Sequence, residues 1–379
     1  MSRFLKYSVG FDCSKDDFQA CTSVIDDEQK VKVKASRKFK NIKKGYNDAV
    51  YWINKHCKEK IPVVITMEAT GNYYEHLALF FHQEGYHVNV VLPNKAKKYM
   101  ESRGIKTKND PVDAKGLAQM GAEQNLRKWE PYTKDIYQLK LLTRQCERLA
   151  AYKTQVSNQL KSLEHGMFQN ADIVKQLEDM LLLIKTQISE SKKQIEIFIA
   201  NDEEIKSKVE KILPTTGLGI QTIASVIAET NGFKLFRNQK QLTSYAGYDV
   251  VENQSGKRTG KTRISKKGNS HIRRAMHFAA LSAVRGKEKT FLDIYKRVYE
   301  KTKIKMKGYV AVQRKLLCLI YTLWKKDQVF NSDFAQSSGN NEPKTLFQLS
   351  EEKKVASKEL EATLDRLPCK KSPEALFQL

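Results

Sequence analysis

The order of the apolar segments in the first 93 residues most constrains how this chain can fold. Three strand-like segments come first, KYSVGFD (6–12), FQACTSVID and VKVKASRKFK, and polar turn residues separate them. A helical pattern, the apolar strand PVVITMEAT (62–70), a second helical pattern that closes on Gly85 and the strand HVNVVLP follow. Three early strands followed by helix, strand, helix and strand are typical of a ribonuclease-H-like α/β domain. We predict such a domain over residues 1–132.

From about residue 133 the pattern changes to that of long helices. Positions spaced 4-3-4-3 run from Leu142 to Leu163, and the spacing resumes from Leu177 to Phe198 after the interruption HGMFQNAD. This is the spacing of the a and d positions of a coiled coil. We therefore predict a long, antiparallel helical hairpin over residues 133–205. Plain core helices and pairing between chains both explain the seam, although Lys153 within it disfavours a tight dimer there.

A second globular part is expected over residues 206–330. It begins with ILPTTGLGIQTIASVIAET and includes two amphipathic helical stretches, RRAMHFAALSAVRG and YVAVQRKLLCLIYTLWKK. We predict a mainly α-helical domain here. Residues 331–379 are rich in Ser, Asn, Glu and Lys, and we expect them to form a polar, poorly ordered tail.

The composition indicates the kind of partner. The chain of 379 residues has a formal net charge of +24, which is typical of proteins that bind nucleic acid or anionic membranes. No apolar run approaches the roughly 20 residues that span a bilayer, and the N-terminal residues lack the apolar core of a signal peptide. The six cysteines form no CxxC pair and do not cluster with histidines at zinc-ligand spacing. We expect a cytoplasmic protein that binds nucleic acid, with no membrane partner and no zinc.

Four acidic residues form the candidate metal site. Asp12 ends the first strand and Glu68 ends a later one, while Asp110 and Asp113 lie in KNDPVDAKGLAQ. We expect Asp110 to be the N-cap of a helix with Pro111 at its first position, so that Asp113 is its third residue. Carboxylates at strand ends and at a helix end can converge on hydrated Mg²⁺, which prefers oxygen ligands, and two such ions can assist phosphoryl transfer.

A structural explanation of the same acids stays open. Asp110 and Asp113 would make a good capping pair without any metal. Glu68, close to Gly71, could be an ordinary turn residue. The hypothesis of a metal site depends on finding all four acids together in a ribonuclease-H-like strand order, within a strongly basic protein.

The stretch from Glu252 to Arg274 is the candidate nucleic-acid contact. Glycine, serine, threonine and asparagine are interleaved with its cations, so backbone and hydroxyl donors could join them on phosphates. The eight candidate cations are Lys257, Arg258, Lys261, Arg263, Lys266, Lys267, Arg273 and Arg274. Upstream, Gly217 and Gly219 in TTGLG could let backbone N–H groups approach a phosphate at a helix N-terminus, or could simply form a tight turn that packs helices.

Several blocks resemble, in order, those of the DEDD-type insertion-sequence transposases, the bridge-RNA-guided serine recombinases with a RuvC-like N-terminal domain. VGFDCSKDDF, MEATGNYYEHLA and KTKNDPVDAKGLA resemble the signature blocks of that domain. LPTTGLGIQTIASVIAE, FRNQKQLTSYAGYD and SGKRTGKTRISKKGNSHIRRAMHFAA resemble the C-terminal transposase domain. The resemblance is collinear over roughly residues 5–327. It implies that Asp12, Glu68, Asp110 and Asp113 are the catalytic acids and that Ser255 is the catalytic serine.

The resemblance also implies a mechanism and partners. A serine hydroxyl is a weak nucleophile without a base or a metal, and the nearest histidines, His271 and His277, fall on the following helix. We therefore expect Mg²⁺ held by the four acids to activate Ser255 or to polarise its target phosphate. Attack would leave a phosphoserine link and a free hydroxyl, and reversal onto another hydroxyl would join new partners without ATP. The implied partners are donor and target DNA, a structured guide RNA, and a second copy or further copies of the chain in a dimer or tetramer.

Three alternatives stay open at this point. His271 and Arg274 have the spacing of a tyrosine-recombinase motif, with Tyr295, Tyr299 and Tyr309 downstream. A RuvC-like nuclease that hydrolyses DNA junctions with water would use the four acids but form no covalent intermediate. A non-catalytic nucleic-acid scaffold would need neither the acids nor the serine.

Overall fold

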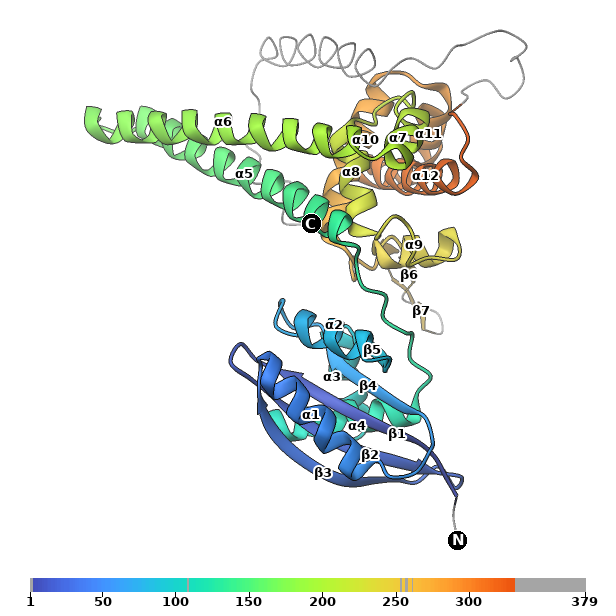
Figure 1. The fold of residues 1–379 in the computed structure, drawn as a ribbon. Coiled ribbons are helices and arrows are strands. Elements are labelled where there is room, and N and C mark those ends of the chain that lie inside the picture. The colour runs from blue at the N-terminus through green and yellow to red at the C-terminus, as the bar shows by residue number, and fades with distance from the viewer. Residues whose placement is uncertain (1–2, 108, 253, 256–257, 261, 331–379) are drawn as a thin grey trace. The chain divides into compact units, whose positions relative to one another are not determined.

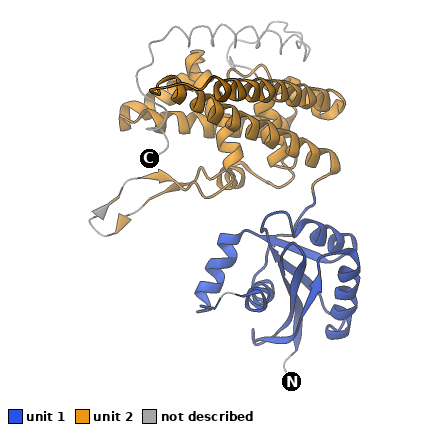
Figure 2. Ribbon diagram, turned by 90° about the vertical axis from the view of Figure 1, so that its left-hand side faces the viewer, with its two compact units in different colours: residues 1–131 blue, residues 132–379 orange. Residues whose placement is uncertain are grey.

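The computed structural model describes residues 3–107, 109–252, 254–255, 258–260 and 262–330, which fall into two compact units, residues 1–131 and 132–379 (Figure 2). The tail predicted over residues 331–379 lies outside the described residues, as do Lys257 and Lys261. No helix among the described residues is long and apolar enough to cross a membrane.

Unit 1 is built on one mixed sheet with the strand order β3-β2-β1-β4-β5 (Figure 1). The two early hairpin connections make β1, β2 and β3 antiparallel, whereas β4 pairs with β1, and β5 with β4, in parallel. The strands are β1 (Phe4–Cys13), β2 (Asp17–Asp26), β3 (Val31–Lys40), β4 (Val63–Glu68) and β5 (His87–Val91). The predicted order of strands and helices is therefore confirmed.

Helices cover both faces of this sheet. The helices of unit 1 are α1 (Lys43–His56), α2 (Glu75–Gln83), α3 (Pro93–Ser102) and α4 (Asp110–Glu123). α1 and α2 bury one face, where Phe11 and Phe18 of the sheet pack with Trp52 and Phe81. α4 packs on the opposite face against β1, β2 and β4. Side chains alternate between the faces of a strand, so each strand contributes to both layers.

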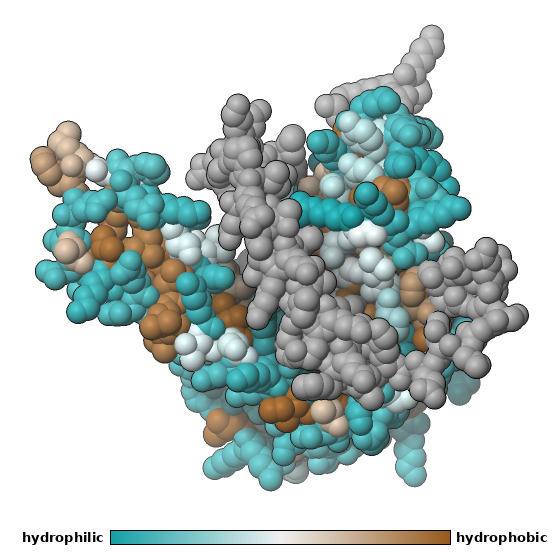
Figure 3. All heavy atoms as spheres, turned by 90° about the horizontal axis from the view of Figure 1, so that it is seen from above, coloured by the Kyte–Doolittle hydropathy of each residue, from teal (hydrophilic) through white to brown (hydrophobic). Residues whose placement is uncertain are grey.

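Unit 2 begins with two long helices that form a hairpin, α5 (Lys134–Glu164) and α6 (Ala171–Ala200). They pack along a seam that includes Leu149, Val156 and Ile184, three of the predicted a and d positions. The helical hairpin is thus present, while its coiled-coil character and any pairing between chains stay predictions. Apolar side chains are also exposed on the hairpin (Figure 3), among them Phe168 and Leu182, which are 86% and 66% exposed.

The rest of unit 2 is a helical core with short strands inserted in it. Its helices are α7 (Glu203–Ile212), α8 (Ile220–Glu229), α9 (Gln239–Tyr245), α10 (Ser270–Arg285), α11 (Lys289–Thr302) and α12 (Lys305–Lys326). Four two-residue strands between α9 and α10 carry the basic stretch: β6 (Val250–Val251), β7 (Gln254–Ser255), β8 (Arg258–Thr259) and β9 (Arg263–Ile264). Sequence reasoning did not predict α3, α7, α9 and α11.

Candidate active site

Asp12 and Glu68 lie side by side on neighbouring strands of unit 1. The parallel pairing of β1 with β4 places Phe11 opposite Met67, and the two acids follow one residue further along both strands. Phe11 and Met67 point into the apolar core, so the alternation of side chains turns Asp12 and Glu68 to the opposite face, which α4 covers. Both acids are half-buried there.

Helix α4 brings the other two acids to the same edge of the sheet. A Cβ atom on Gly121 would lie 2.5 Å from Ser8 Oγ, whereas a Cβ on Gly10 would lie 2.9 Å from the carbonyl carbon of Leu117. The later part of α4 therefore crosses the sheet at Ser8, and its earlier part crosses at Gly10, two residues before Asp12. The first turn of α4, with Asp110 and Asp113, continues in the direction of Asp12.

The cap of α4 differs from the prediction. Asn109, not Asp110, is the N-cap: it has extended backbone angles, and its side-chain oxygen accepts a hydrogen bond of 3.0 Å from the Val112 amide. Asp110 is the first helical residue and Asp113 the fourth. Because Asn109 already satisfies the amide that a cap must bond, Asp110 is not needed as the cap.

The donor chemistry of this edge fits a divalent cation. Four carboxylates from β1, β4 and α4 supply the hard oxygen ligands that Mg²⁺ prefers, and the two on α4 also lie at the positive end of the helix dipole. Among the described residues, no three Asp, Glu, His or Cys side chains are already close enough together to hold a metal ion. Glu68 also has a turn contact, because Thr70 Oγ1 donates to its Oε1 at 2.9 Å.

Ser255 lies in unit 2, at the end of β7. It is exposed, and it pairs across a short antiparallel ladder with Arg258. The two-residue strands around it belong to the basic stretch, whose Arg263 and Lys267 are exposed as well. The side chain of Arg258 is not described. The serine therefore lies in a cationic, solvent-accessible segment, as the sequence predicts, while its catalytic role stays a prediction.

Two of the predicted phosphate contacts already have protein partners. Arg273 Nη1 donates to the Ala246 carbonyl oxygen at 2.9 Å, and Arg274 forms an ion pair with Glu147 of α5. His271 Nδ1 lies 2.7 Å from the same carboxylate. These contacts with Glu147 give His271 and Arg274 a structural role at the start of α10 that does not require DNA.

Gly217 has a packing role. Its φ is +89°, and a Cβ there would lie 2.8 Å from the Ala283 amide nitrogen of α10 and even closer to the Ala279 carbonyl. Only glycine allows α10 to approach this turn so closely. Gly219, by contrast, is the N-cap of α8 and faces open space. A phosphate contact stays a prediction for both residues.

Glu229 is a buried carboxylate that holds the end of the basic stretch in place, and sequence reasoning did not identify it. Glu229 is 1% exposed and accepts from Arg144 Nε at 2.6 Å and from Asn269 Nδ2 at 2.7 Å. Burial alone would raise the pKa of Glu229, but the bonds from Arg144 and Asn269 outweigh it, and the pKa lies below the ordinary value. Asn269 also caps α10 through the Ile272 amide. The sequence feature that could have indicated this buried carboxylate is a charged residue at the end of the apolar helical segment IASVIAE.

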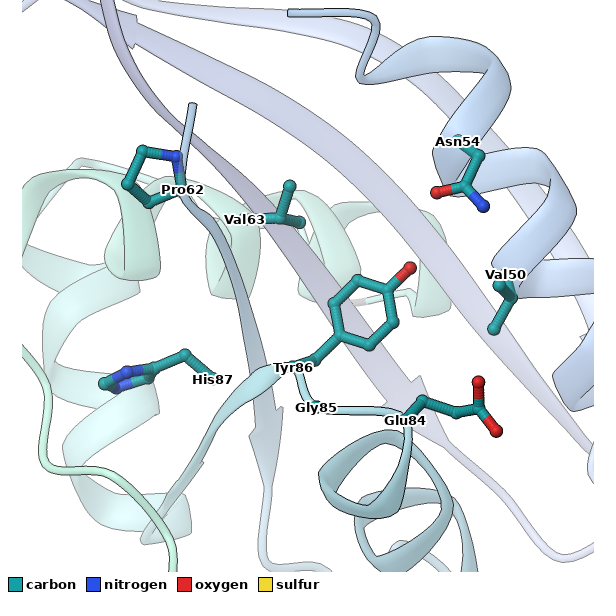
Figure 4. Close-up of a pocket in the computed structure, with 8 residues that line it drawn as sticks. All are labelled: Val50, Asn54, Pro62, Val63, Glu84, Gly85, Tyr86 and His87. Atoms are coloured by element: carbon teal, nitrogen blue, oxygen red, sulfur yellow. The ribbon is translucent and has the colours of Figure 1, made fainter. Parts of the chain in front are cut away.

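A surface pocket with a volume of about 470 Å³ lies elsewhere in unit 1 (Figure 4). Val63 and His87, at the starts of β4 and β5, line it together with residues of α1 and of the turn after α2. Glu68 is at the opposite end of β4, so this pocket is separate from the four acids.

The strand order and the mixed pairing of the strands give unit 1 a ribonuclease-H-like fold. A solved RuvC structure from Thermus thermophilus matches 31% of this chain and 93% of its own, with 12% identity and a TM-score of 0.25. Two family models match the chain, one described as "Transposase" over residues 9–169 and one as "Transposase IS116/IS110/IS902 family" over residues 209–296.

Two relatives span most of the chain. The pilin gene-inverting protein of Moraxella bovis is 27% identical over 327 residues, which are 86% of this chain and 98% of the relative. The transposase for insertion sequence element IS1111A of Coxiella burnetii is 23% identical and covers 85% of this chain and 90% of its own. The chain therefore carries the transposase domains of the IS110 family, and it is an enzyme that acts on DNA.

Proposed function

We propose that this enzyme cuts and rejoins DNA strands through a covalent link between Ser255 and a DNA phosphate. The observation that carries the proposal is that Asp12 and Glu68 lie on neighbouring strands, towards whose ends the first turn of α4 with Asp110 and Asp113 runs, in a chain with transposase domains. The exposed position of Ser255 in a cationic segment supports its role as nucleophile. The relative named for inverting a gene supports rejoining, because inversion requires both cutting and joining.

In the proposed step, Ser255 Oγ forms a bond to phosphorus while the bond from phosphorus to one DNA oxygen breaks. The serine proton passes to solvent, and the departing oxygen takes up a proton to leave a free hydroxyl. The number of phosphoester bonds is unchanged, so the reverse step onto another DNA hydroxyl needs no external energy source. The exposed cations Arg263 and Lys267 would hold neighbouring phosphates and so fix the strand.

The role of the four acids is to hold a divalent cation. When bound by Asp12, Glu68, Asp110 and Asp113, Mg²⁺ would stabilise the negative charge that develops on the attacked phosphate. Asn109 fixes the start of α4, and the glycine contact at Gly10 holds the helix against β1. These contacts restrict the positions of Asp110 and Asp113 before any ligand binds.

The decisive experiment looks for a protein–DNA adduct. Purified protein, its co-purifying RNA and end-labelled DNA are incubated with Mg²⁺ and separated under denaturing conditions. We expect a protease-sensitive adduct with the wild type, none with Ser255→Ala, and an undiminished adduct with Ser270→Ala, which removes another exposed serine nearby. Chelation of the divalent cation should abolish adduct formation. An adduct that persists in Ser255→Ala would instead favour a tyrosine nucleophile.

Hydrolysis of DNA junctions by water is the second candidate function, because all four acids belong to unit 1 and this reaction needs no serine. It predicts cut DNA without any adduct, in the wild type and in Ser255→Ala alike. The absence of both cutting and adduct, under conditions where DNA is bound, would refute both functions.

We further propose that donor and target DNA are selected by a structured RNA and that the active form is a dimer or tetramer. The high net charge supports nucleic-acid partners in general. Sequencing the RNA that co-purifies with the protein tests the guide, with RNA from the Asp12→Asn variant as a comparison. Light scattering of the protein with and without that RNA tests the assembly.

A further inference from the structure

A row of side chains crosses the sheet of unit 1 through the acidic edge and continues beyond it. The antiparallel registers pair Asp12 with Gln19, and Gln19 with Lys38 on the outer strand β3. Paired residues on neighbouring strands point to the same face of a sheet. Lys38 and Gln19 therefore lie on the face that carries Asp12 and Glu68.

The spacing of strands sets how far Lys38 is from the acids. Neighbouring strands lie about 4.8 Å apart, and only β2 separates β3 from β1, so the Cα atoms of Lys38 and Asp12 are two inter-strand spacings, or about 10 Å, apart. The flexible four-carbon stem of a lysine spans much of that distance. A phosphate held over Asp12 would thus be within reach of the Lys38 ammonium group.

In the structure the Lys38 ammonium group forms an ion pair with Asp17. Its Nζ lies 2.9 Å from Asp17 Oδ2, and its side chain is 56% exposed. The hydrogen bond that Lys38 donates to Asp17, together with the charge of Asp17, raises the pKa of Lys38, and the charge of Asp110 raises it a little further. An ion pair with a largely exposed partner contributes only about 0–1 kcal/mol, so little free energy is lost when the Lys38 ammonium group exchanges the Asp17 carboxylate for a phosphate.

The other cations of β3 have different environments. Lys34 lies 4.8 Å over the ring of Phe4, and Arg37 lies 5.2 Å over the ring of Phe39. Lys32 forms an ion pair with Asp26 at 3.3 Å. Lys40, the remaining cation of β3, pairs with Asp17 and not with the residue opposite Asp12. Lys38 is therefore distinguished by its register with Asp12 and not by charge alone.

The end of β3 is also held in place. Asn41 Nδ2 donates to the Ser14 carbonyl at 2.8 Å and to the Tyr73 carbonyl at 3.1 Å. Ser14 directly follows β1, and Tyr73 lies in the segment after β4. The segment that follows β3 is thus tied to the segments that follow β1 and β4, the strands that carry Asp12 and Glu68, which keeps the row together.

We propose that Lys38 is a phosphate-binding residue of the active site: its ammonium group leaves Asp17 and binds a non-bridging phosphate oxygen of the DNA strand that lies over Asp12 and Glu68. This inference rests on the proposed function as far as it requires DNA at the acidic edge. Gln19, between Lys38 and Asp12, donates from its Nε2 to Ser36 Oγ at 2.9 Å, and the second N–H of its amide would donate to the same phosphate region.

The competing explanation is that Lys38 only stabilises β2 and β3 through Asp17, and the two explanations predict opposite results for Asp17→Asn. If Lys38 binds phosphate, removal of the competing carboxylate leaves DNA binding intact or strengthens it. If the ion pair is purely structural, Asp17→Asn has the same defect as Lys38→Gln.

The test measures binding of the full chain to a short branched DNA at several salt concentrations, without divalent cation, together with cutting when Mg²⁺ is present. For Lys38→Gln we expect the slope of log K against log salt to fall in magnitude by about 0.9, the loss of one phosphate contact. The cutting rate should fall about ten- to a hundred-fold, as for one charge-assisted hydrogen bond. Lys38→Arg should retain most of the wild-type salt slope and cutting rate, and the matched control Lys34→Gln should keep the wild-type values of both quantities.

The possible outcomes separate this inference from the proposed function. If Lys38→Gln and Lys34→Gln have the same salt slope, or if Asp17→Asn is as defective as Lys38→Gln, the inference is wrong while the proposed function stands. If the wild type binds DNA but cuts nothing and forms no adduct, the proposed function fails, and the salt slopes still decide whether Lys38 binds phosphate.

Discussion

Substitution of Gly10 by alanine should test how the acidic edge is assembled. Gly10 lies in β1, two residues before Asp12, and the backbone of α4 approaches the sheet closely at its Cα. A Cβ atom there would lie 2.9 Å from the carbonyl carbon of Leu117 and closer still to the Ala114 oxygen and the Ala118 nitrogen. All three are backbone atoms of α4, so no side-chain rotation can relieve the overlap.

The magnitude follows from this geometry. Ordinary contact between carbon atoms needs about 3.5–4.0 Å, so α4 must move outward by on the order of 1 Å. Overpacking of this kind costs about 1–3 kcal/mol of the free energy of unfolding. The same movement displaces Asp110 and Asp113 at the start of α4, and a misplacement of about 1 Å at a catalytic site can reduce the rate about a hundred-fold.

Two measurements check this prediction. Chemical denaturation followed by tryptophan fluorescence reports on unit 1, which contains two of the three tryptophans, Trp52 and Trp129. DNA cutting is measured in parallel, with DNA binding as a reference because the cations are unchanged. We expect Gly10→Ala to lose stability and cutting but to retain binding.

Gly116→Ala is the matched control. Gly116 lies on the same helix, but a Cβ there meets only the flexible side chain of Met100, at 3.0 Å. Alanine is favoured over glycine within a helix by about 1 kcal/mol, so this variant should be neutral or slightly more stable. If Gly10→Ala matched the wild type in both stability and cutting, α4 would not be seated on β1 as described, and the derivation of the acidic edge would fail.

Three further predictions concern other contacts. Asn109→Ala removes the cap of α4 and should lower the free energy of unfolding by about 1 kcal/mol and reduce the DNA cutting rate, as measured by thermal melting and the DNA assay. Asn109→Asp, which keeps a capping side chain, should retain both the stability and the cutting rate. Glu229→Ala leaves the charge of Arg144 without its partner and should lower the free energy of unfolding by about 3 kcal/mol, as measured by chemical denaturation. Glu229→Gln should lose less stability, and equal losses in the two variants would contradict a charged pair. Burial lowers the pKa of His277, so the unfolded chain binds the proton more readily, and stability should fall as pH drops below the ordinary histidine pKa of about 6.5. His277→Gln should flatten that slope in pH-dependent melting curves, and an unchanged slope would assign the effect to other groups.

Much of unit 1 follows from local pattern. The period-two alternation of KYSVGFD and VKVKASRKFK predicts strands, and Gly85, with its φ of +85°, ends α2 as expected. Such features depend on neighbours in the chain, whose stereochemistry is the same in any fold. The cap of α4 was misassigned by one residue, because Asn109 and Asp110 are both good caps and only the backbone angles decide between them.

The four acids and Ser255 could be identified as candidates from the sequence, because their residue types and motif blocks are local. Only the tertiary structure decided that Asp12 and Glu68 share a face, since that depends on the register between β1 and β4. It also assigned Gly217 to packing against α10 and brought Glu229, Arg144 and Asn269 together from three distant segments. Lys38 was one basic residue among many in the sequence; its place in the row with Asp12 comes from two strand registers, which pairing between distant segments determines and local sequence does not.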